Sequence, residues 1–148
     1  MPSREELHKL VDSLPEAFGP QMLNCDNMNL SKPIPILRSF DESKAKEFYV
    51  DFLEFKVDWE HRFAADLPLY MQISKGDCIL HISEHHGDCT PGSALRIEVD
   101  DLDAYQKLLS DKRYKNARPG ICEQPWGRDM SIADPFGNRL VFSHLQST

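Results

Sequence analysis

Residues 36–41 (ILRSFD) and residues 96–101 (RIEVDD) lie sixty positions apart and follow the same scheme. Each is a short run typical of a β-strand, and each ends in an aspartate, Asp41 or Asp101. An aspartate side chain accepts hydrogen bonds from the free N–H groups at the start of a helix, so both residues are predicted N-caps. The sequence therefore predicts a strand followed by a helix twice.

Apolar residues follow both aspartates at the spacing of one helix face, i, i+3, i+4 and i+7. They are Ala45, Phe48, Tyr49 and Phe52 in the first helix, and Leu102, Tyr105, Leu108 and Leu109 in the second. We expect these side chains to pack against a sheet.

Three strand-like runs follow each predicted helix. They span residues 55–60, 69–74 and 78–83 in the first half, and 121–123, 129–133 and 139–143 in the second. Turn formers separate the last two runs of each half, at 75–77 and 134–138. The order β-α-β-β-β thus occurs twice. This predicts an α+β fold of two modules, about 34–90 and 91–144, forming an open, curved, mixed sheet.

Residues 1–33 differ from the rest and predict an N-terminal helical extension and linker, which leaves 34–148 as the main domain. Ser3 is a predicted N-cap, and an apolar stripe at helical spacing follows it. The stripe consists of Leu7, Leu10, Val11, Leu14 and Phe18.

Composition narrows the function classes. The chain has 148 residues and a net charge of −7 without a basic run, which disfavours nucleic-acid binding and favours cationic ligands. No apolar run approaches the roughly 18 residues of a membrane span, and the N-terminus lacks the order of a signal peptide. The four cysteines form no C-x-x-C pair and are interpreted as reduced, structural thiols. We predict a cytoplasmic protein with no membrane partner.

The strands carry polar residues on the side opposite their apolar face. In residues 94–99, for example, Arg96 and Glu98 alternate with Ile97 and Val99. Such a face suits either a concave, wet cavity or an ordinary solvated sheet surface, and the periodicity favours neither.

Several motifs carry a resemblance to a known family. They are FY at 48–49, LHIS at 80–83, TPGS at 90–93, EQPWGR at 123–128 and DPFGN at 134–138. Over residues 34–144 the chain resembles the vicinal-oxygen-chelate superfamily, which includes glyoxalase I. It is most similar to the bleomycin-resistance branch.

The resemblance implies four possible metal-ligand positions, which correspond here to Ile34, His81, Ala94 and Val141. Three are apolar, and a divalent ion of this class needs at least three N or O donors. We therefore predict no metal and no cofactor, and interpret His81 as a hydrogen-bonding cavity residue. The neighbouring His85-His86 pair is interpreted as a polar connection between the modules.

Neither a nucleophile in an activating motif nor a phosphate-binding loop is present, so binding is favoured over catalysis. The resemblance implies a homodimer that sequesters a cationic, aromatic small molecule in clefts at the subunit interface, as antibiotic-resistance proteins do. The predicted ligand contacts are Asp58, Trp59, Phe63, His81, Arg96, Glu98 and Trp126.

In this interpretation Trp126 stacks on the ligand, and Asp58 attracts a positively charged group. Arg96 and Glu98 stand where the antibiotic binders have a second aromatic wall, which favours a polar or zwitterionic ligand. Structural roles remain alternatives for Trp126 and for Trp59.

Two other functions stay open. One is a superfamily enzyme, a lyase or thiol transferase with an atypical metal site. The other is a protein-interaction module that uses residues 1–33. The sequence names neither the ligand nor the physiological role.

Overall fold

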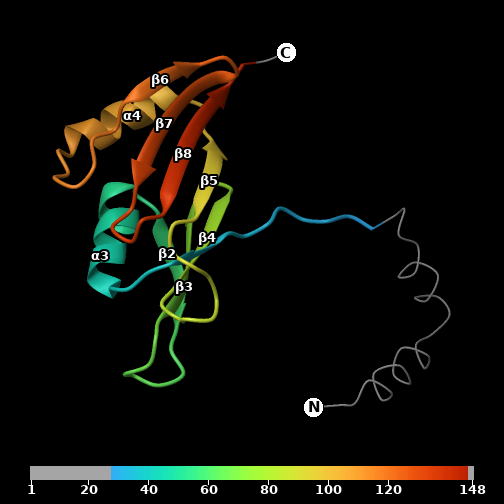
Figure 1. Ribbon diagram of the computed structural model, residues 1–148, viewed down its shortest axis with the longest axis vertical. Coiled ribbons are helices and arrows are strands. Elements are labelled where there is room, and N and C mark those ends of the chain that lie inside the picture. Colours follow the sequence, from blue (N-terminus) through green and yellow to red (C-terminus); the bar gives the residue numbers. More distant parts are fainter. Residues whose placement is uncertain (1–27, 147–148) are drawn as a thin grey trace. The chain divides into compact units, whose positions relative to one another are not determined.

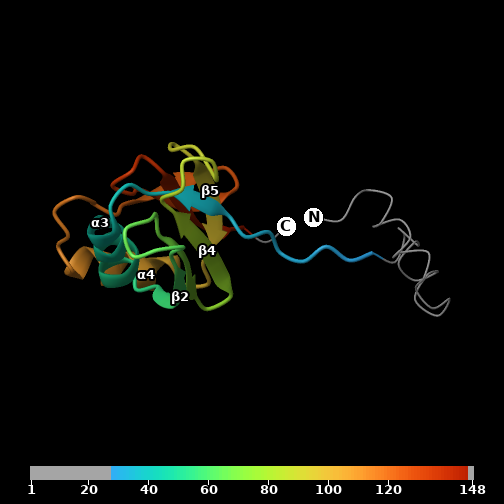
Figure 2. The ribbon, with the colours of Figure 1, turned by 90° about the horizontal axis from the view of Figure 1, so that it is seen from below.

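From Ile34 onward the protein contains two four-stranded sheets, each with a helical segment from the same module (Figures 1 and 2). They are seen in a computed structural model that describes residues 28–146. The helix predicted within residues 1–33 lies outside these described residues, apart from 28–33, which form no regular element. Within 28–146, no helix is long and apolar enough to cross a membrane.

The predicted β-α-β-β-β order is confirmed in both modules. Module 1 consists of β1 (Ile36–Arg38), α3 (Glu42–Lys46), η2 (Glu47–Phe52), β2 (Lys56–His61), β3 (Tyr70–Lys75) and β4 (Cys78–Ser83). Module 2 consists of β5 (Ala94–Glu98), α4 (Leu102–Asp111), β6 (Ile121–Gln124), β7 (Gly127–Ala133) and β8 (Arg139–Leu145). The sheet orders, β1-β4-β3-β2 and β5-β8-β7-β6, are equivalent, and β1–β4 and β5–β8 are the parallel pairs.

Both helices start at the predicted aspartates. The Asp41 side chain accepts a hydrogen bond from the Lys44 backbone N–H at 2.9 Å. Asp101 does the same for the Ala104 N–H at 3.0 Å. Each cap satisfies a donor that the first helical turn leaves without a partner.

The first helix widens into a π-helix, η2, which ends at Phe52. Two residues later, Glu54 has a left-handed φ of 64°. Its predicted stripe is buried throughout, with Phe48 and Tyr49 exposed by no more than 1%. In α4, Leu102 and Leu109 are buried, but the prediction for Leu108 is wrong, because its side chain is 39% exposed. At about 100° per residue, Leu108 lies beside the buried face rather than on it.

Buried and partly buried hydrogen bonds join the two modules. The Tyr49 hydroxyl donates to the Asp134 carboxylate at 2.6 Å, and the Asn138 amide donates to the Arg38 carbonyl at 2.9 Å. The Asn138 amide also donates to Asp134 at 2.8 Å. We call Tyr49, Asp134 and Asn138 the module seam. It ties the module 1 helix to the β7–β8 turn, which lies beside α3 in Figure 1.

Candidate ligand-binding faces

The first candidate site lies on one face of the module 1 sheet. Buried residues such as Met71 and Leu80 occupy the opposite face, so the alternate residues of β3 and β4 share the face away from the core. Strand register places His81 beside Gln72, and Gln72 beside Trp59. We call Asp58, Trp59, Tyr70, Gln72, Ser74 and His81 the module 1 face.

A continuous chain of hydrogen bonds crosses this face. The Tyr70 hydroxyl lies 2.6 Å from Nδ1 of His81, and Nε2 of His81 lies 3.0 Å from Oε1 of Gln72. The Gln72 amide then donates to Asp58 at 3.1 Å. Ser74 donates to the other Asp58 oxygen at 3.0 Å. The hydrogen bonds from Gln72 and Ser74, together with nearby Lys56, lower the pKa of Asp58.

The Trp59 ring packs against two members of this hydrogen-bond chain, Tyr70 and His81. The Trp59 ring lies nearly parallel to that of Tyr70, at 9° and 5.9 Å between centroids. It meets His81 edge-on at 5.3 Å. With 42% of its surface exposed, Trp59 offers much of its ring to solvent. Burial lowers the pKa of His81, so the imidazole is neutral at physiological pH.

Module 2 presents a different arrangement, which we call the module 2 face: Arg96, Trp126, Asp129 and Ser143. The buried Asp129 carboxylate collects donors from all three other residues. Arg96 donates at 2.7 Å, Ser143 at 2.9 Å and the Trp126 indole N–H at 3.2 Å. Burial raises the pKa of Asp129, but the hydrogen bonds from Arg96, Ser143 and Trp126 outweigh it and leave the pKa lowered.

Trp126 lies in the two-residue turn between β6 and β7, and its position is tightly fixed. Gln124 and Gly127 pair across the turn, and the Gln146 N–H donates to the Trp126 carbonyl at 3.0 Å. Gly127 has a φ of 147°, and a Cβ there would lie 2.3 Å from the His144 carbonyl oxygen. The indole is nevertheless 48% exposed, with the Arg96 guanidinium 5.7 Å from its centroid.

The structure therefore gathers the predicted contacts into two groups. Asp58, Trp59 and His81 lie together, and Arg96 lies beside Trp126. Phe63, which is 75% exposed, packs edge-on against His61 at 4.8 Å and His85 at 6.1 Å.

Glu98 is exposed and lines a separate hollow of about 460 Å³ between the β3–β4 turn, β5 and α4. Among residues 28–146, neither the Phe63 nor the Glu98 side chain makes a hydrogen bond or ring contact to either face. The β5–β8 register nevertheless sets Glu98 opposite Ser143. Phe63 is thus set apart from both groups, whereas Glu98 is a neighbour of the module 2 face that makes no side-chain hydrogen bond to it.

Five polar residues of the faces were not predicted: Tyr70, Gln72, Ser74, Asp129 and Ser143. The alternation within each strand does put Tyr70 and Gln72 on one side of β3. Recognising their partners requires the strand register, which sets Gln72 beside His81 and Asp129 beside Ser143. One sequence contains no direct signal for that register.

The four positions that the resemblance marks as possible metal ligands do not fit a metal here. Ile34, Ala94 and Val141 offer no side-chain donor. Both ring nitrogens of His81 are already engaged by Tyr70 and Gln72. In the part of the chain that the structure describes, no three His, Cys, Asp or Glu side chains cluster as a metal site would require.

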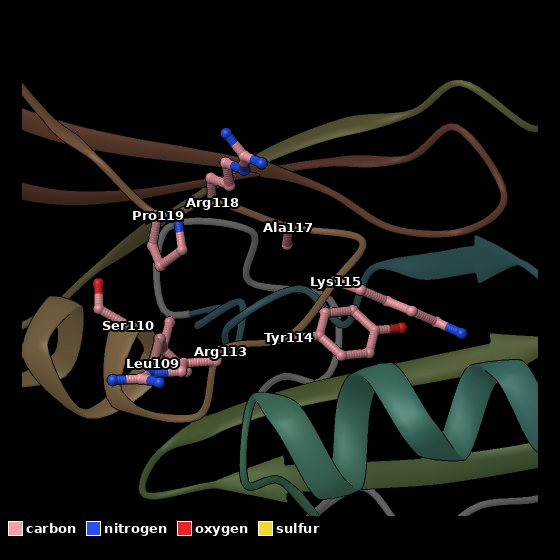
Figure 3. Close-up of a pocket in the computed structure, with 8 residues that line it drawn as sticks. All are labelled: Leu109, Ser110, Arg113, Tyr114, Lys115, Ala117, Arg118 and Pro119. Carbon is pink, nitrogen blue, oxygen red and sulfur yellow. The ribbon is translucent and has the colours of Figure 1, made fainter.

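A further hollow, of about 420 Å³, follows α4 and is lined by three cationic residues, Arg113, Lys115 and Arg118. Figure 3 shows that their charged ends point in different directions from the rim. An anion of modest size needs donors that converge on it, so this arrangement is not built as an anion site.

Comparison with known proteins identifies the family. The family model described as "Glyoxalase superfamily protein" matches residues 21–147. The chain therefore belongs to the glyoxalase superfamily. The match starts at residue 21, within the stretch 1–33 that was predicted as helical extension and linker. A search of curated proteins finds no match.

Solved structures add more specific likenesses. A bleomycin-binding protein from bleomycin-producing Streptomyces verticillus, complexed with copper(II)-bleomycin, is 29% identical, with a TM-score of 0.60, covering 80% of this chain and 99% of that one. The antibiotic-binding protein TnmS3 from Streptomyces sp. CB03234 is 24% identical, with a TM-score of 0.65 and the same coverage. A bleomycin resistance determinant encoded on the transposon Tn5 is 18% identical, with a TM-score of 0.61, covering 80% and 100%.

Proposed function

We propose that this protein is a binder of the bleomycin-resistance type, which sequesters a flat, cationic small molecule without a metal or cofactor. The observation that carries the proposal is the half-exposed ring of Trp126, held in place by Asp129. The likeness to a bleomycin-binding protein and to an antibiotic-binding protein supports the same ligand class.

Trp126 has the properties of a prepared stacking surface. Its backbone is fixed by the β6–β7 turn, and its N–H is satisfied by Asp129, so little rotational freedom remains to be lost on binding. Arg96 lies near the ring on one side, and its charge is balanced by Asp129. A flat ligand gains ring contact there without facing an unpaired cation.

The charge of the chain favours a cationic group on the ligand. The net charge is −7, and the ionised Asp58 lies on the module 1 face. The ring of Trp59 beside it provides a second attractive surface for a cation. A ligand with a flat part and a cationic part is thus complementary to Trp126 and to Trp59.

We further propose that a second copy of the chain completes the binding clefts. β1 and β5 are edge strands of their sheets, and Ile34 and Ile36 are 43% and 38% exposed. Unpaired edges with apolar side chains are stabilised by association with another chain. Light scattering at micromolar concentration is expected to give a dimer. A monomer, both with and without ligand, contradicts the shared clefts.

Calorimetric titration with metal-free bleomycin tests the central proposal. We expect the wild-type protein to bind, and Trp126→Ala to lower the affinity more than tenfold, because stacking adds about 0.5–1.5 kcal/mol to the lost burial. Trp126→Phe keeps a ring and is the matched variant, with an intermediate loss expected.

Thermal melting of the same samples separates binding from structure. A half-exposed ring predicts a small loss of stability, whereas a core tryptophan loses about 3–5 kcal/mol when replaced by alanine. Large destabilisation with no specific binding defect assigns Trp126 a structural role. Absence of bleomycin binding by the wild-type protein contradicts the proposed ligand class.

The metal-free part of the proposal has its own test. Elemental analysis of the purified protein is expected to find no stoichiometric Ni, Zn, Fe or Mn. A stoichiometric metal, retained after dialysis and required for binding, favours the alternative of a superfamily enzyme.

A further inference from the structure

The hydrogen-bond chain on the module 1 face has only one possible direction. The ionised Asp58 can only accept, so the Gln72 atom facing it is the amide nitrogen. The Gln72 oxygen then faces His81 and accepts from Nε2, which must carry the proton. Nδ1 of the neutral ring is left as an acceptor, and the Tyr70 hydroxyl donates to it.

This direction determines what Tyr70 offers to a ligand. A hydroxyl has one proton and two acceptor lone pairs, and His81 takes the proton. Burial raises the pKa of Tyr70, and the charges of Asp88 and Cys89 raise it further, so the phenol stays protonated. Its oxygen therefore presents acceptor capacity and no donor.

We propose that Tyr70 is a specificity-determining residue that accepts a hydrogen bond from an N–H group of the ligand. Gln72 and His81 act as positioning residues that turn its proton away. The preferred ligand group is a primary or secondary ammonium, or another cationic N–H donor. This inference rests on the proposed function, because it requires that the module 1 face contacts the ligand.

The surroundings of Tyr70 fit this ligand group. The parallel Trp59 ring, 5.9 Å away, offers a π face to a cation that reaches the Tyr70 oxygen. Register aligns Arg38, Ser83, Tyr70 and His61 in one row across the sheet. Arg38 is held over Phe40 at 4.9 Å, and the Ser83 hydroxyl donates to Asp88 at 2.6 Å. The charge of Asp88 acts on Tyr70, and Asp58 ends the hydrogen-bond chain, so both carboxylates favour a positive ligand.

Two matched probes isolate the proposed hydrogen bond: benzylammonium, which has N–H donors, and benzyltrimethylammonium, which has the same ring and charge but none. Their affinities are measured from NMR shifts of the Trp59 indole. We expect the wild-type protein to prefer benzylammonium by about two- to tenfold, the range of one net hydrogen bond.

Tyr70→Phe is expected to remove this preference while leaving the affinity for benzyltrimethylammonium unchanged. Tyr114→Phe deletes the same atom at a ring that packs against Phe52 near α4, and is expected to keep the preference. A preference that survives Tyr70→Phe overturns the inference. So does equal binding of both probes by the wild-type protein, or no binding of either.

The direction of the chain is tested without any ligand. Nitrogen-15 NMR at neutral pH is expected to show His81 with a protonated Nε2 and an unprotonated Nδ1. Gln72→Leu is expected to weaken this tautomer preference, which a role in packing alone would not change. The opposite tautomer in the wild-type protein overturns the inference.

These outcomes are separable from those of the bleomycin titration. Bleomycin binding without the Tyr70-dependent preference leaves the proposed function standing and the inference overturned. The Tyr70-dependent preference without bleomycin binding leaves the acceptor role of Tyr70 standing and replaces the proposed ligand with another N–H cation.

Discussion

The two modules place different chemistry on equivalent strands. In module 1 the hydrogen bonds run in sequence from Tyr70 through His81 and Gln72 to Asp58. In module 2 they converge on a single carboxylate, Asp129, which takes donors from Arg96, Ser143 and Trp126. The same β-α-β-β-β scaffold therefore carries a directional hydrogen-bond chain on the module 1 face and a convergent hydrogen-bond cluster on the module 2 face.

The two hydrogen-bond arrangements have different consequences, although they are built on the same fold. A linear hydrogen-bond chain fixes where its protons lie, because a group that accepts from one neighbour must donate to the next. A convergent cluster fixes side-chain positions instead, because one buried anion holds several groups. Module 1 is thus suited to choosing hydrogen-bonding partners, and module 2 to presenting the rigid ring of Trp126.

The largest expected effect comes from breaking the module seam. Asp134 accepts from the Tyr49 hydroxyl, from the Phe136 and Asn138 backbone N–H groups and from the Asn138 amide. Asp134→Ala leaves these donors without their partner in a buried site, so we expect unfolding by urea to show a loss of about 3–5 kcal/mol.

Asp103→Ala is the matched control, because the Asp103 carboxylate also accepts hydrogen bonds, two from Arg128, but is exposed on α4. We expect it to change stability little. Similar losses in both variants contradict the idea that the seam holds the two modules together.

The next effect distinguishes the turns of the two modules. Gly127→Ala puts a Cβ 2.3 Å from a backbone carbonyl and also occupies a φ of 147°, so we expect a loss of about 2–4 kcal/mol in urea unfolding. Gly76→Ala, in the β3–β4 turn, has a φ of 58° but nothing within 4 Å of the added Cβ. Its expected loss is about 1 kcal/mol.

Equal losses in the two glycine variants contradict the close approach of β8 at the Trp126 turn. A selective loss in Gly127→Ala is also expected to weaken bleomycin binding, because the turn positions the Trp126 ring. Binding measured on the folded fraction separates this effect from simple unfolding.

Local patterns in the sequence account for most of the fold. Asp41 and Asp101 cap helices as predicted, because capping depends on residues only three positions away. The turns at 75–77 and 134–138 also follow from local chemistry. Leu108 shows the limit, because a stripe of four positions does not define the exact centre of the buried face.

The site residues depend on longer distances and were recovered only in part. Trp126 and Arg96 were predicted from the family motif and the strand pattern, but Asp129, which binds both, was not. Tyr70 and Gln72 became meaningful only through their register with His81. Strand register determines which residues of neighbouring strands lie side by side, and the spacing of residues within one strand does not reveal it.

The smallest expected effect is a difference in pH dependence between the two faces. Burial lowers the pKa of His81, so the unfolded chain takes up this proton near pH 6.5 and the folded chain only at lower pH. Between these two pKa values the unfolded state binds more protons, and stability falls as the pH falls. Below the folded pKa the contribution stays constant. Asp129 has a lowered pKa as well, and its hydrogen bonds lose their charged acceptor only below about pH 4.

Urea unfolding from about pH 7.5 to 3 in wild type, His81→Gln and Asp129→Asn tests this separation. His81→Gln is expected to remove a stability loss that begins near pH 6.5, and Asp129→Asn one that begins near pH 4. The hydrogen-bond chain of module 1 explains the stability loss near pH 6.5, because a protonated Nδ1 of His81 can no longer accept from Tyr70. If wild type and His81→Gln lose stability in parallel below pH 6.5, the hydrogen-bond chain does not keep His81 neutral in the folded state, and this prediction is wrong.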